Sequence, residues 1–268
     1  ILARRLVEEH EFLREDGRVR VILSVGDEGE LRLAGASIPK SDPKAFTSLT
    51  VVYDLLQYLG WDCPGAMRRS HQRPSDDVLD DSYKILVSRL DDLMKYCGDT
   101  RARLAGAGSA KEIRAPKDHE GAGHPFLRPV VQKAVARVAS EIVQAGLLTW
   151  EDAMLRLAGL EWKLSENPWR AVYAADAGKM LTTKEHTDLL CELLHVHLAP
   201  TSLAAIKRAR KNFKDLRSIQ YEITEEELAE RIVTAPQVPV SEIKLPEKEI
   251  SEGLEITLPV DAESAGSE

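Results

Sequence analysis

The sequence has a cluster of basic side chains between Thr201 and Arg217, where Asp215 is the one acid. The bases are Lys207, Arg208, Arg210, Lys211, Lys214 and Arg217. Their spacing places them on more than one face of a helix, so some must face solvent. Lysine and arginine that contact phosphates release counterions, which gives affinity for nucleic acid without sequence preference. These six are our candidate DNA-binding residues, and a solvated helix face explains them equally well.

The charge of the chain is divided unevenly around this cluster. From Ser218 to Glu268 there are 13 acids and 3 bases, whereas residues 1–217 carry 33 bases and 31 acids. The net charge of −8 is therefore a property of the C-terminal segment and does not argue against nucleic-acid binding. The acidic segment could also fold over the basic helix and screen it. Phe213, within the cluster, could stack on a base or anchor the helix.

Histidine and cysteine residues near position 190 raise the question of a metal site. Cys191 and His195 are four residues apart, so they share a helical face and could both bind zinc. His197 lies about 200° from His195 around a helix, and no CxxC or HExxH pattern accompanies them. Core or surface roles are favoured, and we expect no metal and no cofactor. Three widely spaced cysteines indicate reduced thiols of a cytosolic protein.

No other residues form a recognisable catalytic pattern. The sequence lacks GxxxxGK[ST], GxGxxG and GxSxG. Adjacent acids, such as Asp80-Asp81 and Asp91-Asp92, fall in helical sequence, where neighbours point about 100° apart. A solvated face explains them better than paired catalytic carboxylates. We expect no catalytic residue in this chain, and any active site would lie upstream of Ile1.

A central stretch, 124–173, must position these side chains. Its valines and alanines recur every three or four residues after Pro129, which predicts a helix ending near Gly146. Thr149 predicts the N-cap of a second helix that Asn167-Pro168 ends. Trp150, Trp162 and Trp169 are expected to pack in the core, with a base-stacking platform as the alternative.

The remaining elements are mostly helical. Helices are predicted at 1–9, 47–59, 78–97, 183–199, 201–217 and 224–232. Alternating residues from Arg18 to Val25 predict a strand, followed by a hairpin turn into Leu31–Leu33. Residues 98–123 show no period and are expected to form a flexible loop, whose bases give a second candidate contact with nucleic acid. The fold class is therefore mainly α, with a small β-hairpin near the N-terminus and a disordered acidic C-terminal tail.

Several segments resemble DGQHR-domain proteins, the family that includes the DNA sulfur-modification protein DndB. The similar pieces are LARRLVEEHEFL, AFTSLTVVYDLLQYLGW, LRPVVQKAVARV and LEWKLSENPWRAVY, in the family's order over about residues 1–175. The Asp-Gly-Gln-His-Arg motif that names the family is absent and would lie upstream of Ile1. The resemblance implies that 1–40 end a ParB-like α/β region, 41–217 form a helical domain and 218–268 form the tail.

The resemblance also implies a function linked to DNA. We expect a cytoplasmic, DNA-binding regulator or accessory subunit of a bacterial DNA-modification (phosphorothioation-like) or phage-defence system. The alternative is a helical protein-interaction scaffold that docks such a complex through its tail without touching DNA. The expected partners are DNA and other proteins of the system, with an oligomer allowed and no membrane, since no apolar run approaches about 20 residues.

Overall fold

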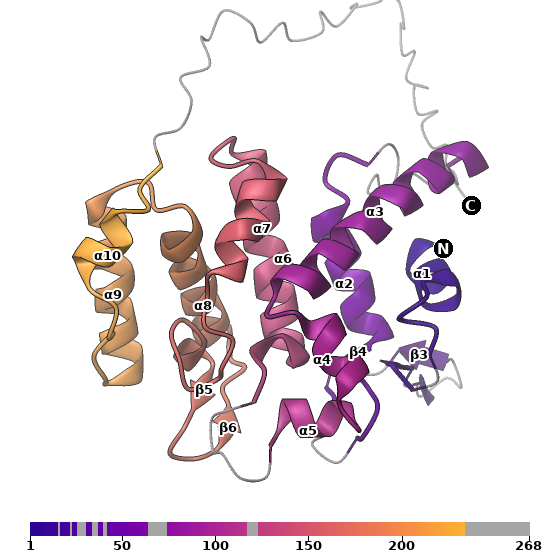
Figure 1. Cartoon of the computed structure of the whole chain (residues 1–268), viewed down its shortest axis with the longest axis horizontal. Helices are drawn as coiled ribbons and strands as arrows, with labels where there is room; N and C mark the ends of the chain where they lie inside the picture. The colour runs from indigo at the N-terminus through magenta and orange to yellow at the C-terminus, as the bar shows by residue number, and fades with distance from the viewer. Residues whose placement is uncertain are drawn as a thin grey trace, which may run out of the picture. The chain divides into compact units, whose positions relative to one another are not determined.

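The computed structural model describes residues 1–15, 17–21, 23–25, 31–33, 37–39, 42–63, 74–116 and 123–233. These residues are mainly α-helical, as the sequence predicts (Figure 1). The α-helices are α1 (Leu2–Glu9), α2 (Leu49–Leu59), α3 (Asp76–Tyr96), α4 (Thr100–Gly106), α5 (Ala110–Arg114), α6 (Pro129–Gln144), α7 (Trp150–Ala158), α8 (Lys184–Leu198), α9 (Leu203–Arg217) and α10 (Glu225–Ala229).

Helix α6 is the centre of the packing. It contacts α2, α7 and α8, and Figure 1 shows it between α2 and α8. Its buried residues include Gln132 and Ser140 as well as the predicted valines, so burial extends beyond one apolar face. A helix enclosed on most sides belongs to a core rather than to a surface layer. This position makes α6 the element against which the other helices are placed.

The buried amide of Gln132 is fully used. Its Nε2 donates to the carbonyls of Phe46 and Phe126 at 3.2 and 2.8 Å, and its Oε1 accepts from the Thr47 hydroxyl at 2.8 Å. A buried polar side chain is tolerated when its donors and acceptors are paired in this way. These bonds fix α6 to the segment that leads into α2.

Two tryptophans close the turn after α7. The ring centroids of Trp162 and Trp169 lie 4.7 Å apart, and the side chains are 6% and 0% exposed. Their indole N–H groups donate to the carbonyls of Leu157 and Glu161 at 3.1 and 2.7 Å. The prediction of core packing is confirmed for this pair, because buried rings offer no platform for a base. The Asn167-Pro168 peptide bond in this turn is cis.

Residues 98–116 differ from the predicted flexible loop. They contain α4 and α5, with Leu104 and Ala110 buried at 3% and 4% exposure. Helices of seven and five residues are too short to show a hydrophobic period, so their order depends on tertiary contacts. Of the bases there, Arg101 pairs with Glu11 and Asp91, while Lys117 and the rest of 117–122 lie outside the described residues.

The β-structure consists of short pairs. β2 (Leu23–Val25) and β3 (Leu31–Leu33) are antiparallel with Leu23 opposite Leu33, which confirms the predicted hairpin. Two further pairs were not predicted. They are β1 (Val19–Arg20), parallel to β4 (Thr47–Ser48), and β5 (Tyr173–Ala174), antiparallel to β6 (Lys179–Met180). The predicted strand Arg18–Val25 is divided into β1 and β2, and the other strands of these pairs have two residues and are too short to show alternation.

The chain divides into a compact unit, Ile1–Ala235, and a second unit, Pro236–Glu268. The second unit lies outside the described residues, so the disordered tail, its screening of α9 and its docking of partners stay predictions. The predicted domain boundaries at residues 40 and 217 also stay predictions. Among the described helices, none combines the length and apolar character that a membrane span requires.

Candidate nucleic-acid interface

Helix α9 carries all six candidate DNA-binding residues. Its apolar face is Ile206, Ala209 and Phe213, each 0% exposed, and α9 packs on α8 and α10 (Figure 1). The Phe213 ring lies 4.9 Å from the Tyr221 ring in an edge arrangement. Phe213 therefore anchors the helix, and the interpretation as a base-stacking residue does not fit its burial. The Ser202 hydroxyl starts α9 by accepting from the Ala205 N–H at 3.2 Å.

Three lysines form a row along the outside of α9. Lys207, Lys211 and Lys214 are spaced four and three residues apart, so they share a helical face, and all three are exposed. The row covers about 10 Å of helix axis. Within the described part of the chain, Lys211 and Lys214 have no ion-pair partner. We call these three residues the lysine row.

Carboxylates of neighbouring helices pair with other bases of α9. Arg208 Nε donates to Glu192 Oε1 of α8 at 2.9 Å. Lys207 Nζ and Arg210 Nη1 lie 3.8 and 3.1 Å from the carboxylate of Glu225 in α10. The Lys207 and Arg208 side chains remain 58% and 70% exposed, so each pair stabilises the fold by about 1 kcal/mol or less. A phosphate group could replace these partners at small cost.

Arg210 and Arg217 are less accessible than the rest. The Arg210 side chain is 25% exposed between α9 and α10. Arg217 Nη2 donates to the Tyr173 carbonyl at 3.1 Å, and burial lowers the pKa of its guanidinium, with Asp176 opposing that change. Both arginines hold α9 against its neighbours. The accessible part of the predicted site is therefore the lysine row with Arg208.

The candidate zinc ligands on α8 have other partners. His195 Nε2 lies 2.9 Å from Glu141 Oε2 of α6, and His197 Nε2 lies 2.5 Å from the Tyr221 hydroxyl. Burial raises the pKa of the Cys191 thiol to about 11, and a protonated thiol is a poor nucleophile and a poor metal ligand. Across the described ranges, no three His, Cys, Asp or Glu residues gather as a metal site.

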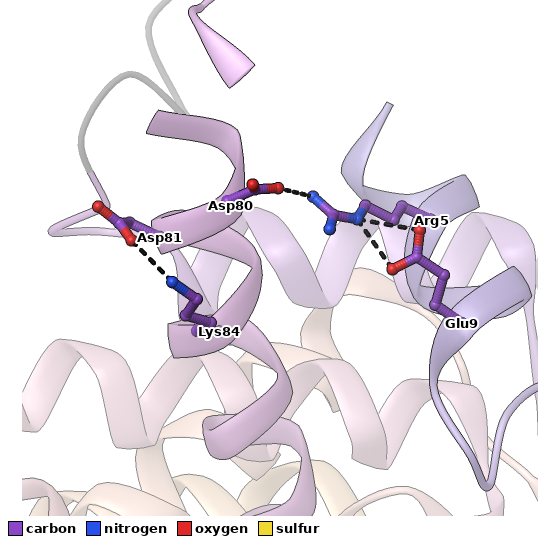
Figure 2. A network of polar contacts seen from close by, with 5 residues as sticks. All are labelled: Arg5, Glu9, Asp80, Asp81 and Lys84. Carbon is purple, nitrogen blue, oxygen red and sulfur yellow. Dashed lines mark hydrogen bonds and ion pairs between the residues drawn. The ribbon is translucent and has the colours of Figure 1, made fainter. Parts of the chain in front are cut away.

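The neighbouring acids of α3 serve as ion-pair partners. Figure 2 shows Asp80 directed towards Arg5 of α1 and Asp81 directed towards Lys84. The distances are 2.5 Å from Arg5 Nη1 to Asp80 Oδ1 and 3.2 Å from Lys84 Nζ to Asp81 Oδ1. Because the two carboxylates point to different partners, they do not act together on one atom. They fit the interpretation as a solvated, ion-paired face.

Two further arginines meet in a site that the sequence did not reveal, although Arg114 is one of the bases of the predicted loop at 98–123. Arg114 at the end of α5 and Arg128 at the start of α6 line one cavity. They are 14 positions apart, so only the fold brings them together. The signal for Arg128 was a basic residue directly before Pro129, where a helix begins.

Comparisons with protein-family models, with curated proteins and with solved structures found no match to this chain.

Proposed function

We propose that this protein binds DNA through the lysine row of α9 and serves, in the bacterial cytoplasm, as a regulator or accessory subunit of a DNA-modification or phage-defence system. The observation that supports DNA contact is the exposure of Lys207, Lys211 and Lys214 on one face. The link to a modification system rests on the resemblance to DGQHR-domain proteins.

The lysine row suits phosphates better than bases. Duplex DNA carries one negative charge per about 1.7 Å of its axis, so a row of about 10 Å meets several phosphates. Lysine is a compact point charge on a flexible stem and contacts phosphate without reading sequence. The aromatic residue of α9, Phe213, is 0% exposed and therefore does not stand beside the row. We therefore expect salt-sensitive binding with little sequence preference from this helix.

The segments that carry the resemblance lie mainly in the core. Val131 and Val135 of the LRPVVQKAVARV segment are 0% exposed, as is Trp169 of the LEWKLSENPWRAVY segment. Buried residues constrain a fold rather than a contact surface. The resemblance thus supports the proposed type of system, whereas the lysine row supports the contact with DNA, and the two arguments are independent.

Fluorescence anisotropy of a labelled duplex, titrated with full-chain protein between 50 and 200 mM salt, tests this proposal. Wild type should bind with an affinity that falls as salt rises. A Lys207/Lys211/Lys214→Gln variant should bind more weakly, and the slope of log K against log salt should decrease by about 3. The control is Lys163/Lys179/Lys184→Gln, which removes three exposed lysines outside α9. Equal losses in both variants would contradict a specific role for the row.

The alternative function is a protein-interaction scaffold without DNA contact. It is favoured by the carboxylates of Glu192 and Glu225 beside α9 and by Leu203 and Leu216, which are 44% and 38% exposed on the same helix. Absence of DNA binding by wild type at 50 mM salt would select this function. The next experiment would then be a pull-down of proteins from the same gene cluster.

A further inference from the structure

A cavity of about 340 Å³ opens beside the first turn of α6. Three basic side chains line it: Arg114 of α5, and Arg128 and Lys133 at the start of α6. The volume lies within the range of small-molecule sites. A cavity of this size admits a small ligand but excludes a DNA duplex, so its role is separate from that proposed for α9.

Arg114 is fixed in place by backbone carbonyls. Its Nη1 donates to the carbonyls of Pro39 and Asp42 at 3.0 and 3.3 Å, and its Nη2 donates to the carbonyl of Ala45. The side chain is 1% exposed, and among the described residues its Nε has no hydrogen-bond partner. A guanidinium held this rigidly loses little conformational entropy when it meets a ligand.

Arg128 makes fewer hydrogen bonds than Arg114 and keeps unused donors. Its Nη2 donates to the Arg114 carbonyl at 2.8 Å. Its Nε is buried without a partner, and within the described ranges Nη1 has no hydrogen bond. A guanidinium presents its donors as a planar fork that matches an oxyanion. The guanidinium of Arg128 therefore has donors at the cavity wall that are available to an oxyanion.

Among the described residues that line this cavity there are three bases and no acid. Asp54 lies 3.3 Å from Lys133 and partly offsets its charge, whereas Asp42 lies 3.6 Å from Arg20. Within the described part of the chain, Arg114 and Arg128 have no carboxylate ion-pair partner. Burial and then the nearby Arg114 lower the pKa of Arg128 to about 10, with Tyr173 opposing them. Buried charge without a counter-charge is unfavourable, and an anion would relieve it.

The start of α6 adds to this field. Helix α6 has 16 residues, begins with Pro129 and has no side-chain cap at Arg128. The partial positive charge of a helix N-terminus favours anions. The cavity also has apolar walls, from Ile38, Leu127, Val130 and Met180, and hydroxyls of Ser37, Thr182 and Thr187. An anion with an uncharged organic part fits such a lining better than a bare ion does.

From this arrangement we infer that the cavity binds a small phosphate ester, with the phosphate group at Arg128, next to the buried charge of Arg114, and the organic part along the apolar wall. The guanidinium of Arg128 supplies donors for the phosphate oxygens, and the partial positive charge of the helix N-terminus adds to the attraction. Lys133, one turn into α6, adds a third cation that can move towards the ligand.

Thermal unfolding of the full chain tests the inference. The probes are adenosine monophosphate and glycerol phosphate, with inorganic phosphate, adenosine and sodium chloride as references at matched ionic strength. A phosphate ester at a hundred times its dissociation constant should raise Tm by about 5 °C or more, because it binds only the folded state. Arg128→Gln should lose the shift, and Lys133→Gln should weaken binding about tenfold. Lys163→Gln, an exposed control, should keep it.

The outcomes separate the possible ligands. No shift beyond sodium chloride with either ester overturns the inference, as does an unchanged shift in Arg128→Gln. A shift with inorganic phosphate that neither ester exceeds assigns the cavity to free phosphate and overturns the ester. If Arg128→Gln does not fold, calorimetric titration of wild type and Lys133→Gln with adenosine monophosphate decides, and equal affinities contradict the inference.

Discussion

The basic helix α9 and the arginine cavity at α6 differ in the exposure of their basic side chains and in the groups that pair with them. On α9 four of the six bases are exposed, and Lys207, Arg208 and Arg210 have carboxylate partners. In the cavity, Arg114 is buried and Arg128 is half-buried, and both have carbonyls for partners. Exposed charges in water are weakly held and can exchange partners, whereas buried charges stay where the fold places them.

The contrast shows what a cluster of charges in sequence can indicate. Six bases close together in the sequence mark α9 as a basic surface helix, because water screens the repulsion between exposed charges. The same screening makes the contribution of each base to stability small. The cavity arginines stand apart in the sequence and meet only through the fold. Two charges that are buried or half-buried are therefore neighbours here although their positions in the sequence do not indicate it.

The largest expected effect separates the two regions by stability. Replacing Arg114 with Met should lower the free energy of unfolding by about 2–4 kcal/mol, because the carbonyls of Pro39, Asp42 and Ala45 lose their donor. The matched change on α9, Arg208→Met, should cost about 1 kcal/mol or less. Urea unfolding at pH 7.5 measures both. A similar loss of unfolding free energy in the two variants would contradict the proposed difference between the two regions.

A second prediction concerns acid, which should weaken both regions. His124, close to the start of α6, and His197, beneath α9, are each 1% exposed, and burial lowers their pKa values to about 4 and about 3. The unfolded chain protonates histidine near pH 6.5, so below that value the unfolded state binds more protons than the folded state. Stability is therefore lost as pH falls from 6.5 towards those values.

The expected size is up to about tenfold in the unfolding constant per pH unit for each histidine. Urea unfolding at pH 6.5, 5.75 and 5.0 measures this slope. His124→Gln and His197→Gln should each flatten it, even where they lower stability at neutral pH. A wild-type unfolding constant that stays level across this interval would contradict the assignment of neutral buried imidazoles.

The helices that carry both regions were predictable because their signals are local. Apolar spacing located α2, α3 and α6, and the predicted cap Thr149 accepts a hydrogen bond from the Asp152 N–H at 3.1 Å. Helices α4 and α5 were missed, since short helices are ordered by tertiary packing. The ion-pair partners could not be predicted from the sequence. Nothing near Arg208 in the sequence indicates that Glu192 of another helix pairs with it. Nothing near Arg128 indicates that its partner in the described structure is a carbonyl and not a carboxylate.

A smaller effect should follow from removing a carboxylate beside α9. Glu225→Gln should release Lys207 and Arg210 from their shared partner and raise the net charge of this face by one unit. DNA affinity at 50 mM salt should rise by a few fold, within the range of an exposed ion pair. Anisotropy titration measures the change, with Glu226→Gln in the same helix as the control. Equal gains in the two variants would mean that net charge alone matters.

The most direct test of the separation between the two regions is the salt slope of DNA binding in two variants measured side by side. In Lys207/Lys211/Lys214→Gln the slope of log K against log salt should decrease by about 3, and in Arg128→Gln it should equal that of wild type. The opposite pattern, with the slope unchanged in the lysine variant and reduced in Arg128→Gln, would place the DNA phosphates at the cavity and contradict the account.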